Sequence, residues 1–127
     1  RRWAAANTVG AYIVLSGFGD WATCPWQPQA WHQYSGTLPE YTFSPSSFMI
    51  SPGFDEASAG APVLGRSLDV WRRSIADMVA SNAPWQLVIS FNEWPEGTSI
   101  ESGGDWASAS GYGAYLDALH DGIPARA

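Results

Sequence analysis

The sequence has few basic residues, a single cysteine and no long hydrophobic run. Six Lys and Arg stand against twelve Asp and Glu, so the 127 residues carry a net charge of −6. No basic stripe is present that could neutralise phosphate groups, which makes nucleic acid and anionic lipid surfaces poor partners. No apolar run approaches the ~20 residues of a membrane-spanning helix, so we expect no membrane insertion.

Cys24 is the only cysteine, which excludes an internal disulfide and a metal site built from several cysteines. No spacing of His, Asp and Glu resembles a metal site, and no glycine-rich loop follows a strand in a phosphate-binding pattern. We therefore expect no cofactor. A single cysteine says little about the compartment, because exported proteins also fold without disulfides. The compartment stays open, and a secreted or extracytoplasmic location is the favoured alternative.

Aromatic residues, by contrast, are abundant: eight Trp, five Tyr and five Phe make 14% of the chain. Several lie in segments rich in Pro, Gly and Ser rather than in apolar stretches. Such side chains can stack against the apolar faces of sugar rings. They can equally cover the core beneath long loops. The composition leaves both interpretations open.

Three short apolar runs predict buried β-strands, at residues 11–15, 47–50 and 86–90. They are apolar almost without interruption, which is typical of parallel strands that are covered on both faces. Amphipathic helices are predicted after the second and third runs, at residues 67–82 and 111–120. In both helices the apolar residues recur at helical spacing.

The predicted helices also carry end signals. Ser67 can cap the start of the first helix, and Pro84 lies just beyond its end. Gly122 and Pro124 close the second. His120, in the last turn of that helix, is expected to favour its negative end.

Strands that alternate with helices and generous loops predict an α/β fold of parallel βα units. A complete (β/α)8 barrel usually has about 250 residues, roughly twice the present length. We therefore expect residues 1–127 to form a single partial barrel segment that belongs to a longer protein. Residues 17–45 would be a long, aromatic-rich connection with one short helical turn near residues 29–34. Loops of this length are usually functional.

The third apolar run leads directly into the segment Asn92-Glu93-Trp94-Pro95-Glu96-Gly97. Two carboxylates would then lie where a parallel strand ends, which is the active-site face of barrels and open α/β sheets. Cleavage of a glycosidic bond needs one protonated and one ionised carboxyl group, and proximity itself makes two carboxylates differ in protonation. Two solvated loop acids are the alternative.

The residues from Ser90 to Glu101 resemble the signature of family 99 glycoside hydrolases, the endo-α-mannosidases and endo-α-mannanases, and of the related WbsX-like proteins of polysaccharide gene clusters. A second stretch, from Ile50 to Asp55, is similar to a Pro-Gly-aromatic-Asp segment that ends an earlier barrel strand in that family. The two stretches lie in the family's order. The match in residues covers the chain from about Phe48 to Glu101, and the remainder agrees in pattern.

The resemblance implies the C-terminal part of a (β/α)8 barrel and retaining hydrolysis of α-mannosidic bonds without a covalent glycosyl-enzyme. In the mechanism proposed for the family, the first glutamate deprotonates the sugar's own 2-hydroxyl, which attacks the anomeric carbon and gives an anhydro sugar. Glu93 would have this role. Glu96 would first protonate the departing oxygen and then activate water.

The sequence departs from the family pattern at Pro95, where endo-mannosidases commonly have histidine, and at Ser102, where proline is usual. The sugar, the linkage and endo or exo action therefore stay open. Pro95 also permits a cis Trp94–Pro95 bond, because X-Pro bonds adopt cis at modest cost. A cis bond there would change the direction of Glu96.

Six further residues are candidates for substrate binding: Asn92, Trp94, Asp55, His32, Trp31 and Tyr34. Asn92 could orient Glu93 or be a turn residue. Asp55 would lie on the same barrel face and bind sugar hydroxyls, or be a solvated loop acid. Trp94 could form the floor of a sugar subsite or belong to the core. His32 could bind a sugar hydroxyl or the leaving oxygen.

Two functions from different classes fit these residues. The first is a glycoside hydrolase that acts on an α-linked, mannose-type oligosaccharide or polysaccharide through the Glu-x-x-Glu pair. The second is a non-catalytic protein that binds carbohydrate or is associated with polysaccharide biosynthesis, in which the same residues grip sugar without cleaving it. A structural remnant without activity is a third. Three parallel units leave strand edges exposed, so the oligomeric state stays open.

Overall fold

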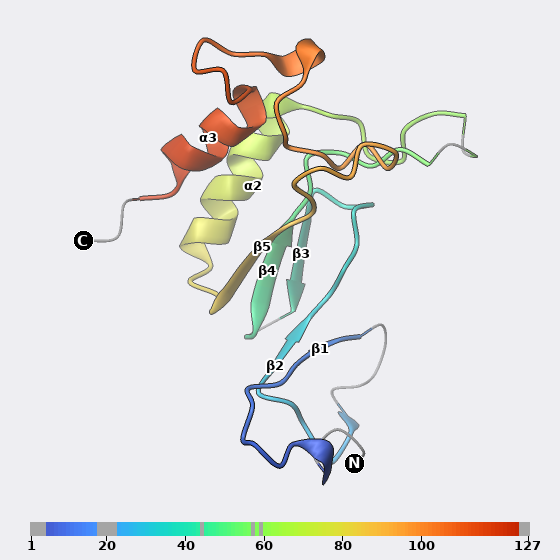
Figure 1. The fold of residues 1–127 in the computed structure, drawn as a ribbon, viewed down its shortest axis with the longest axis vertical. Helices are drawn as coiled ribbons and strands as arrows, with labels where there is room; N and C mark the ends of the chain where they lie inside the picture. The colour runs from blue at the N-terminus through green and yellow to red at the C-terminus, as the bar shows by residue number, and fades with distance from the viewer. Residues whose placement is uncertain (1–4, 18–22, 44, 57, 59, 125–127) are drawn as a thin grey trace.

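The computed structural model describes residues 5–17, 23–43, 45–56, 58 and 60–124. This part of the chain forms a small α/β fold with two small sheets and two α-helices (Figure 1). The first sheet contains two parallel strands, β1 (Val14–Ser16) and β2 (Ala30–His32). It lies at the N-terminal end of the molecule, and β2 contacts β4 of the second sheet.

The second sheet has three strands in the order β3, β4, β5. The strand β3 (Glu40–Phe43) pairs with β4 (Ser47–Ile50) in antiparallel orientation. The strand β5 (Trp85–Val88) pairs with the other edge of β4 in parallel orientation. All four residues of β4 are buried, which makes this strand the centre of the sheet.

The helix α2 (Leu68–Ala80) packs on β4 of this sheet, and α3 (Ala114–Gly122) lies beside α2 (Figure 1). A short 3-10 helix, η2 (Gly104–Trp106), precedes α3. One cluster of buried side chains joins the sheet to both helices: Phe48, Ile50, Trp71, Ile75, Met78, Ile100, Tyr115 and Ala118. Within it, the indole N–H of Trp71 donates a hydrogen bond of 3.0 Å to the carbonyl oxygen of Tyr115, which ties α2 to α3.

The sequence signals for α2 are confirmed. Ser67 is the N-cap, and its hydroxyl accepts a hydrogen bond of 3.4 Å from the Val70 backbone N–H. The buried residues of the helix recur every three or four positions, as in Trp71, Ile75 and Met78. The predicted order of strand, helix and parallel strand is therefore present as β4, α2 and β5.

The long connection differs from its prediction. In place of a helical turn near residues 29–34, residues 30–32 form β2, and residues 40–43 form β3. Backbone pairing with β1 and β4 stabilises these short extended segments, which outweighs the weak local preference of three or four residues. Trp21 of this connection lies outside the described residues.

The expectation of a purely parallel sheet is also wrong. Only residues 44–46 separate β3 from β4, which is too short for the crossover that a parallel pair requires, so the two strands are antiparallel. The strand β5 is not covered on both faces either, since Trp85 is 39% exposed. The described strands form two open sheets rather than a closed barrel. No helix among the described residues has the length and apolar character needed to cross a membrane.

Replacement of Ile75 by alanine should destabilise the fold by about 3 kcal/mol, because it leaves a cavity between α2 and the sheet. The side chain is 1% exposed and belongs to the central cluster. Urea unfolding followed by circular dichroism measures this change. Ala76→Ser, at an exposed position of the same helix, should change the free energy of unfolding by less than about 0.5 kcal/mol. Equal effects of the two substitutions would contradict this assignment of the core.

Candidate active site

Three loops meet at one end of the strands: those after β2, β4 and β5. A methyl group added to Gly36, after β2, would lie 2.7 Å from the Phe54 ring and 3.0 Å from the side chain of Thr98. The backbone N–H of Asp55, after β4, donates a hydrogen bond of 2.8 Å to the carbonyl oxygen of Glu96, after β5. These contacts bring together residues that are far apart in the sequence.

The two glutamates lie on one tight turn in the loop that follows β5. The backbone N–H of Gly97 donates to the carbonyl oxygen of Trp94 at 3.0 Å, and that of Thr98 donates to the carbonyl oxygen of Glu93 at 3.3 Å. Gly97 has a φ of 63°, a conformation that favours glycine. Glu93 is exposed and Glu96 is half-buried. The pair therefore sits at the surface, and its two members differ in access to solvent.

Hydroxyl groups hold the base of this turn. The side chains of Ser90 and Thr98 form a hydrogen bond of 2.8 Å, and the Ser90 N–H donates to the Thr98 carbonyl oxygen at 2.9 Å. The Ser90 hydroxyl also accepts from the backbone N–H of Glu93 at 3.0 Å. Because Thr98 is fully buried, the turn is anchored to the interior directly beneath the carboxylates.

Arg66, which precedes α2, contacts the same loop through its side chain. Its guanidinium donates to the carbonyl oxygens of Gly97 at 2.7 Å and Ser99 at 2.8 Å. Its central carbon lies 4.0 Å from the ring centroid of Trp106 and 4.2 Å from that of Tyr115. Partial burial lowers the pKa of Arg66 below its ordinary value, while interactions with Tyr115 oppose that change. An arginine nevertheless stays charged at neutral pH.

Trp94, between the two glutamates, stacks on Trp106 with ring centroids 5.3 Å apart and an interplanar angle of 12°. Its indole N–H donates to the carboxylate of Glu101 at 2.8 Å, and the indole of Trp106 donates to the backbone carbonyl of Glu101 at 2.8 Å. Trp94 is still 44% exposed. This tryptophan is therefore a fixed surface ring rather than a core residue.

Tyr34 is the residue of the long connection that lies near the glutamates. Its phenol is only slightly buried, and its side chain is 52% exposed. The loss of solvent raises the pKa of Tyr34 above its ordinary value, and the charges of Glu96 and then Glu93 raise it further. A negative charge near a phenol disfavours the phenolate, which is why both carboxylates raise this pKa.

The other predicted site residues divide into two groups. Asn92 is exposed on the glutamate loop, and Asp55 is exposed beside Glu96 through its backbone contact. Trp31 and His32 are instead part of β2. Trp31 is buried, stacks on Phe43 at 5.7 Å and donates its indole N–H to Gln27 at 2.8 Å. His32 is half-buried, and its carbonyl accepts from Gly17 at 3.3 Å. These contacts link Trp31 and His32 to the sheets and their connections, not to the glutamate turn.

The Trp94–Pro95 bond is not cis. The cis bond among the described residues is Ile89–Ser90, which follows β5. The hypothesis that a cis proline bond directs Glu96 is therefore wrong, and the hydrogen-bonded turn from Trp94 to Gly97 sets the course of the backbone instead.

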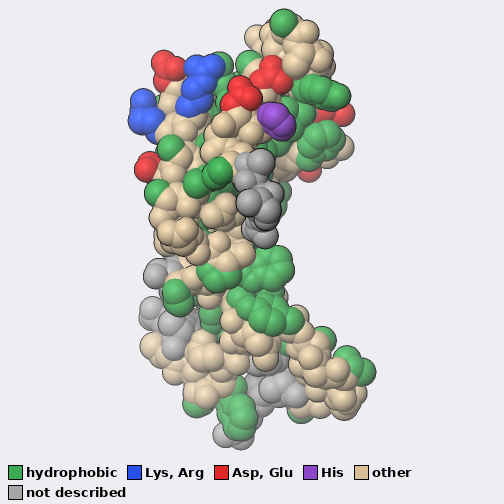
Figure 2. Space-filling model, turned by 90° about the vertical axis from the view of Figure 1, so that its left-hand side faces the viewer, with side chains coloured by type: hydrophobic (Ala, Val, Ile, Leu, Met, Phe, Trp, Pro, Cys, Tyr) green, Lys and Arg blue, Asp and Glu red, His purple; other side chains and the backbone are tan. Residues whose placement is uncertain are grey.

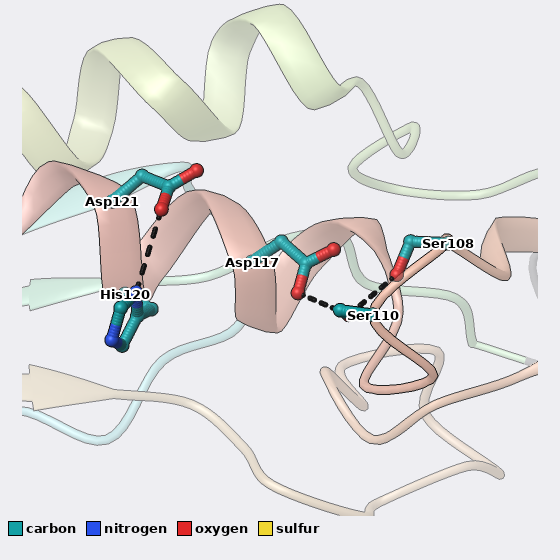
Figure 3. A network of polar contacts seen from close by, with 5 residues as sticks. All are labelled: Ser108, Ser110, Asp117, His120 and Asp121. Carbon is teal, nitrogen blue, oxygen red and sulfur yellow. Dashed lines mark hydrogen bonds and ion pairs between the residues drawn. The ribbon is translucent and has the colours of Figure 1, made fainter.

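A pocket of about 550 Å³ lies elsewhere, along α3, lined by Ser110, Tyr112, Leu116, Asp117, His120 and Asp121. Figure 3 shows its polar groups: Asp117 accepts a hydrogen bond of 2.6 Å from Ser110, and His120 lies 3.4 Å from Asp121. Hydrogen bonds from Ser110 and Ser108 lower the pKa of Asp117. Asp117 thus stabilises the start of α3, and neither Glu93 nor Glu96 lines this pocket.

No group of three or more His, Cys, Asp or Glu side chains that could hold a metal ion occurs within the described ranges. Comparisons with protein-family models, with curated proteins and with solved structures gave no match. The arrangement itself can present two carboxylates, a phenol and a fixed indole ring to a ligand at the surface.

Arg66, Ser90, Thr98, Glu101 and Trp106 are site residues that the sequence did not single out. Their contacts are to backbone atoms of the glutamate loop, to each other and to Trp94. The sequence carried one usable signal: Ser90, Thr98 and Glu101 flank the Glu-x-x-Glu segment itself. No sequence signal pointed to Arg66, because it lies 31 residues from Gly97 in the chain.

Gly97→Ala should destabilise the chain by about 1–2 kcal/mol, because an L-residue is strained at this backbone conformation. The added methyl group would also lie 3.2 Å from the Cβ of Asp55. Gly65→Ala is the matched control, since nothing lies within 4 Å of the methyl group there. Thermal unfolding of both variants tests the turn. If Gly97→Ala leaves the unfolding temperature unchanged, the turn adopts another conformation.

Glu96→Gln should lower the pKa of Tyr34 toward its ordinary value, because a neutral amide no longer repels the phenolate. Glu93→Gln should lower it less, since Glu96 has the larger effect of the two. A pH titration of ¹³C-labelled tyrosine side chains by NMR measures the shift. Asp77→Asn, on the exposed face of α2, is the control and should leave Tyr34 unchanged. A Tyr34 titration that is the same in all variants would place its phenol away from the pair.

Proposed function

We propose that this chain contributes the active site of a glycoside hydrolase that acts on an α-linked, mannose-type oligosaccharide or polysaccharide. The observation that carries the proposal is the position of Glu93 and Glu96 on one anchored turn after β5. Paired carboxylates at the end of a parallel strand are the arrangement that glycosidic cleavage uses.

The reaction that we propose proceeds in two steps with retention. Glu93 removes the proton of the sugar's 2-hydroxyl, and the oxygen attacks the anomeric carbon as the bond to the departing oxygen breaks. Glu96 gives its proton to that departing oxygen. In the second step Glu96 takes a proton from water, and the water oxygen attacks the anomeric carbon of the anhydro sugar. The bond between that carbon and the 2-oxygen breaks, and Glu93 returns a proton to the 2-oxygen.

The surroundings of the pair support these roles. An acid and a base in one site need different environments, and Glu96 is the more buried of the two. Trp94 supplies a fixed, half-exposed ring to which a pyranose could stack. Asp55 lies beside Glu96, where it could accept hydrogen bonds from sugar hydroxyls.

The parallel unit β4, α2 and β5 supports a further part of the proposal, that the chain is the C-terminal part of a (β/α)8 barrel. In such a barrel each strand lies between two neighbours, whereas β5 has a partner only in β4 among the described strands. The proposed barrel would pair the free edge of β5 with a strand outside the described residues.

A non-catalytic carbohydrate-binding role is the second candidate. It is favoured by the exposure of the aromatic side chains near the glutamates, since Tyr34 and Trp94 are both about half exposed. Stacking rings and hydrogen-bonding carboxylates are enough to bind sugar without cleaving it. The same residues would serve a protein associated with polysaccharide biosynthesis.

Separate Glu93→Gln and Glu96→Gln variants distinguish the two candidates. With α-linked manno-oligosaccharides, each substitution should lower kcat by about 10²- to 10⁴-fold, because it removes a proton-transfer group, while binding changes little. Product analysis gives kcat, and calorimetry gives the affinity. Asp77→Asn is the control and should leave both unchanged. A wild-type chain that binds the sugar but releases no product favours the binding role, and one that does neither contradicts both.

An activated aryl glycoside separates the roles of the two glutamates. Its leaving group departs without a proton, so Glu96→Gln should slow the first step, measured as release of the aryl group, far less than it slows cleavage of an oligosaccharide. Glu93→Gln should be equally impaired on both substrates. A substrate that lacks the 2-hydroxyl should not be cleaved, and its rapid hydrolysis would rule out the anhydro intermediate.

A further inference from the structure

We propose that Arg66 is a positioning residue that holds the glutamate turn in its working geometry. The geometric part of this inference concerns the chain alone, and the effect on catalysis rests on the proposed function. Arg66 lies just before α2 and contacts no carboxylate of the pair directly. It acts through the backbone of the loop that carries them.

The contact involves two carbonyl groups of the loop. Arg66 donates to Gly97 at 2.7 Å and to Ser99 at 2.8 Å, so its guanidinium bridges the residues on either side of Thr98. The backbone N–H of Thr98 in turn bonds to the carbonyl oxygen of Glu93, and that of Gly97 to Trp94. Movement of either carbonyl would therefore shift the turn that presents both glutamates.

Aromatic rings fix the guanidinium itself. Its central carbon lies about equally far from the rings of Trp106 and Tyr115, at 4.0 and 4.2 Å. A planar guanidinium can contact rings and donate from two nitrogens at the same time, whereas the ammonium group of lysine is a single point charge. These contacts with two carbonyl groups and two rings thus require the shape of an arginine side chain and not merely a positive charge.

The ring of Trp106 also connects Arg66 to Trp94, the ring on which we propose that the sugar stacks. Trp106 is in contact with Arg66 and stacks on Trp94, and Glu101 accepts hydrogen bonds from both indoles. The arginine therefore contacts the glutamate turn directly, through two hydrogen bonds. It is connected to the Trp94 ring indirectly, because the indole of Trp106 lies between them. The remaining guanidinium nitrogen, Nε, is buried without a hydrogen-bond partner. The two hydrogen bonds of the terminal nitrogens thus both go to carbonyl oxygens of the loop.

Hydrogen exchange followed by mass spectrometry tests the geometric part without a substrate. In Arg66→Lys, amide exchange in residues 93–101 should rise about tenfold over wild type, because local opening of the loop becomes easier, while exchange in β4 stays the same. Arg72→Lys, an exposed arginine on α2 paired with Asp69 at 3.6 Å, is the matched control and should change neither region.

The wild-type chain offers a second measurement that needs no variant. Guanidinium nitrogens held by two hydrogen bonds rotate slowly, so Arg66 should show separate ¹⁵N signals for its two terminal nitrogens, whereas Arg72 shows one averaged signal. A single averaged signal for Arg66 would overturn the proposal. The proposal also fails if Arg66→Lys leaves loop exchange unchanged or raises exchange equally throughout the chain.

Kinetics test the catalytic consequence. For a positioning residue, Arg66→Lys should lower kcat by about 10²-fold, because a small displacement of reacting groups is costly, while KM changes only a few-fold. Arg72→Lys should leave kcat unchanged. An unchanged kcat together with a loosened loop would overturn the catalytic role. If the wild-type chain cleaves nothing, the proposed hydrolase fails, while hydrogen exchange and NMR still decide the role of Arg66 in the loop.

Discussion

The candidate site depends on one interaction, the pair of hydrogen bonds from the Arg66 guanidinium to the loop after β5. Loops are the mobile parts of a domain, yet catalytic groups must be held closely in place. Hydrogen bonds from a charged donor are worth about 1.5–3 kcal/mol each, and the contacts with Trp106 and Tyr115 add cation–π attraction. These contacts tie the start of α2, the glutamate turn and α3 into one unit. The carboxylates can then lie at the surface without losing their relative positions.

The parts of the fold that the sequence predicted are those in which many residues carry the same signal. The helix α2 combines a cap at Ser67 with apolar residues at regular spacing, and β4 is a buried apolar run. The strands β2 and β3 have three or four residues each, so no period can be recognised in them. Their extended form comes from pairing with strands distant in the sequence. The prediction of parallel strands alone was wrong because β3, which is antiparallel to β4, is too short to be recognised in the sequence.

The sequence predicted the candidate site chiefly where its residues are close together in the chain. Glu93, Glu96 and Trp94 follow directly from one segment. Tyr34 was a candidate from the aromatic-rich connection, and the influence of the Glu96 and Glu93 charges on its pKa now relates it to the pair. Supporting contacts such as Arg66 to Gly97 join residues that a helix and a strand separate in the sequence, so they leave no local pattern. Trp31 shows the opposite case. It lies in an aromatic-rich segment that suggests sugar stacking, yet its stacking partner is Phe43, and it is buried.

The distribution of charge bears on the kind of ligand that this surface suits. Residues 5–17 and 23–43 contain one Asp, Glu, Lys or Arg side chain, Glu40. On the face drawn in Figure 2, the charged side chains gather at the end that carries α2 and α3, and the opposite end displays uncharged and apolar groups. An uncharged polymer meets no electrostatic barrier on such a surface, whereas phosphate-bearing polymers find few cations to neutralise them. After β5 such a ligand would meet a group of carboxylates, Glu93, Glu96 and the neighbouring Asp55, and the proposed proton transfer to and from a neutral sugar would need two of them.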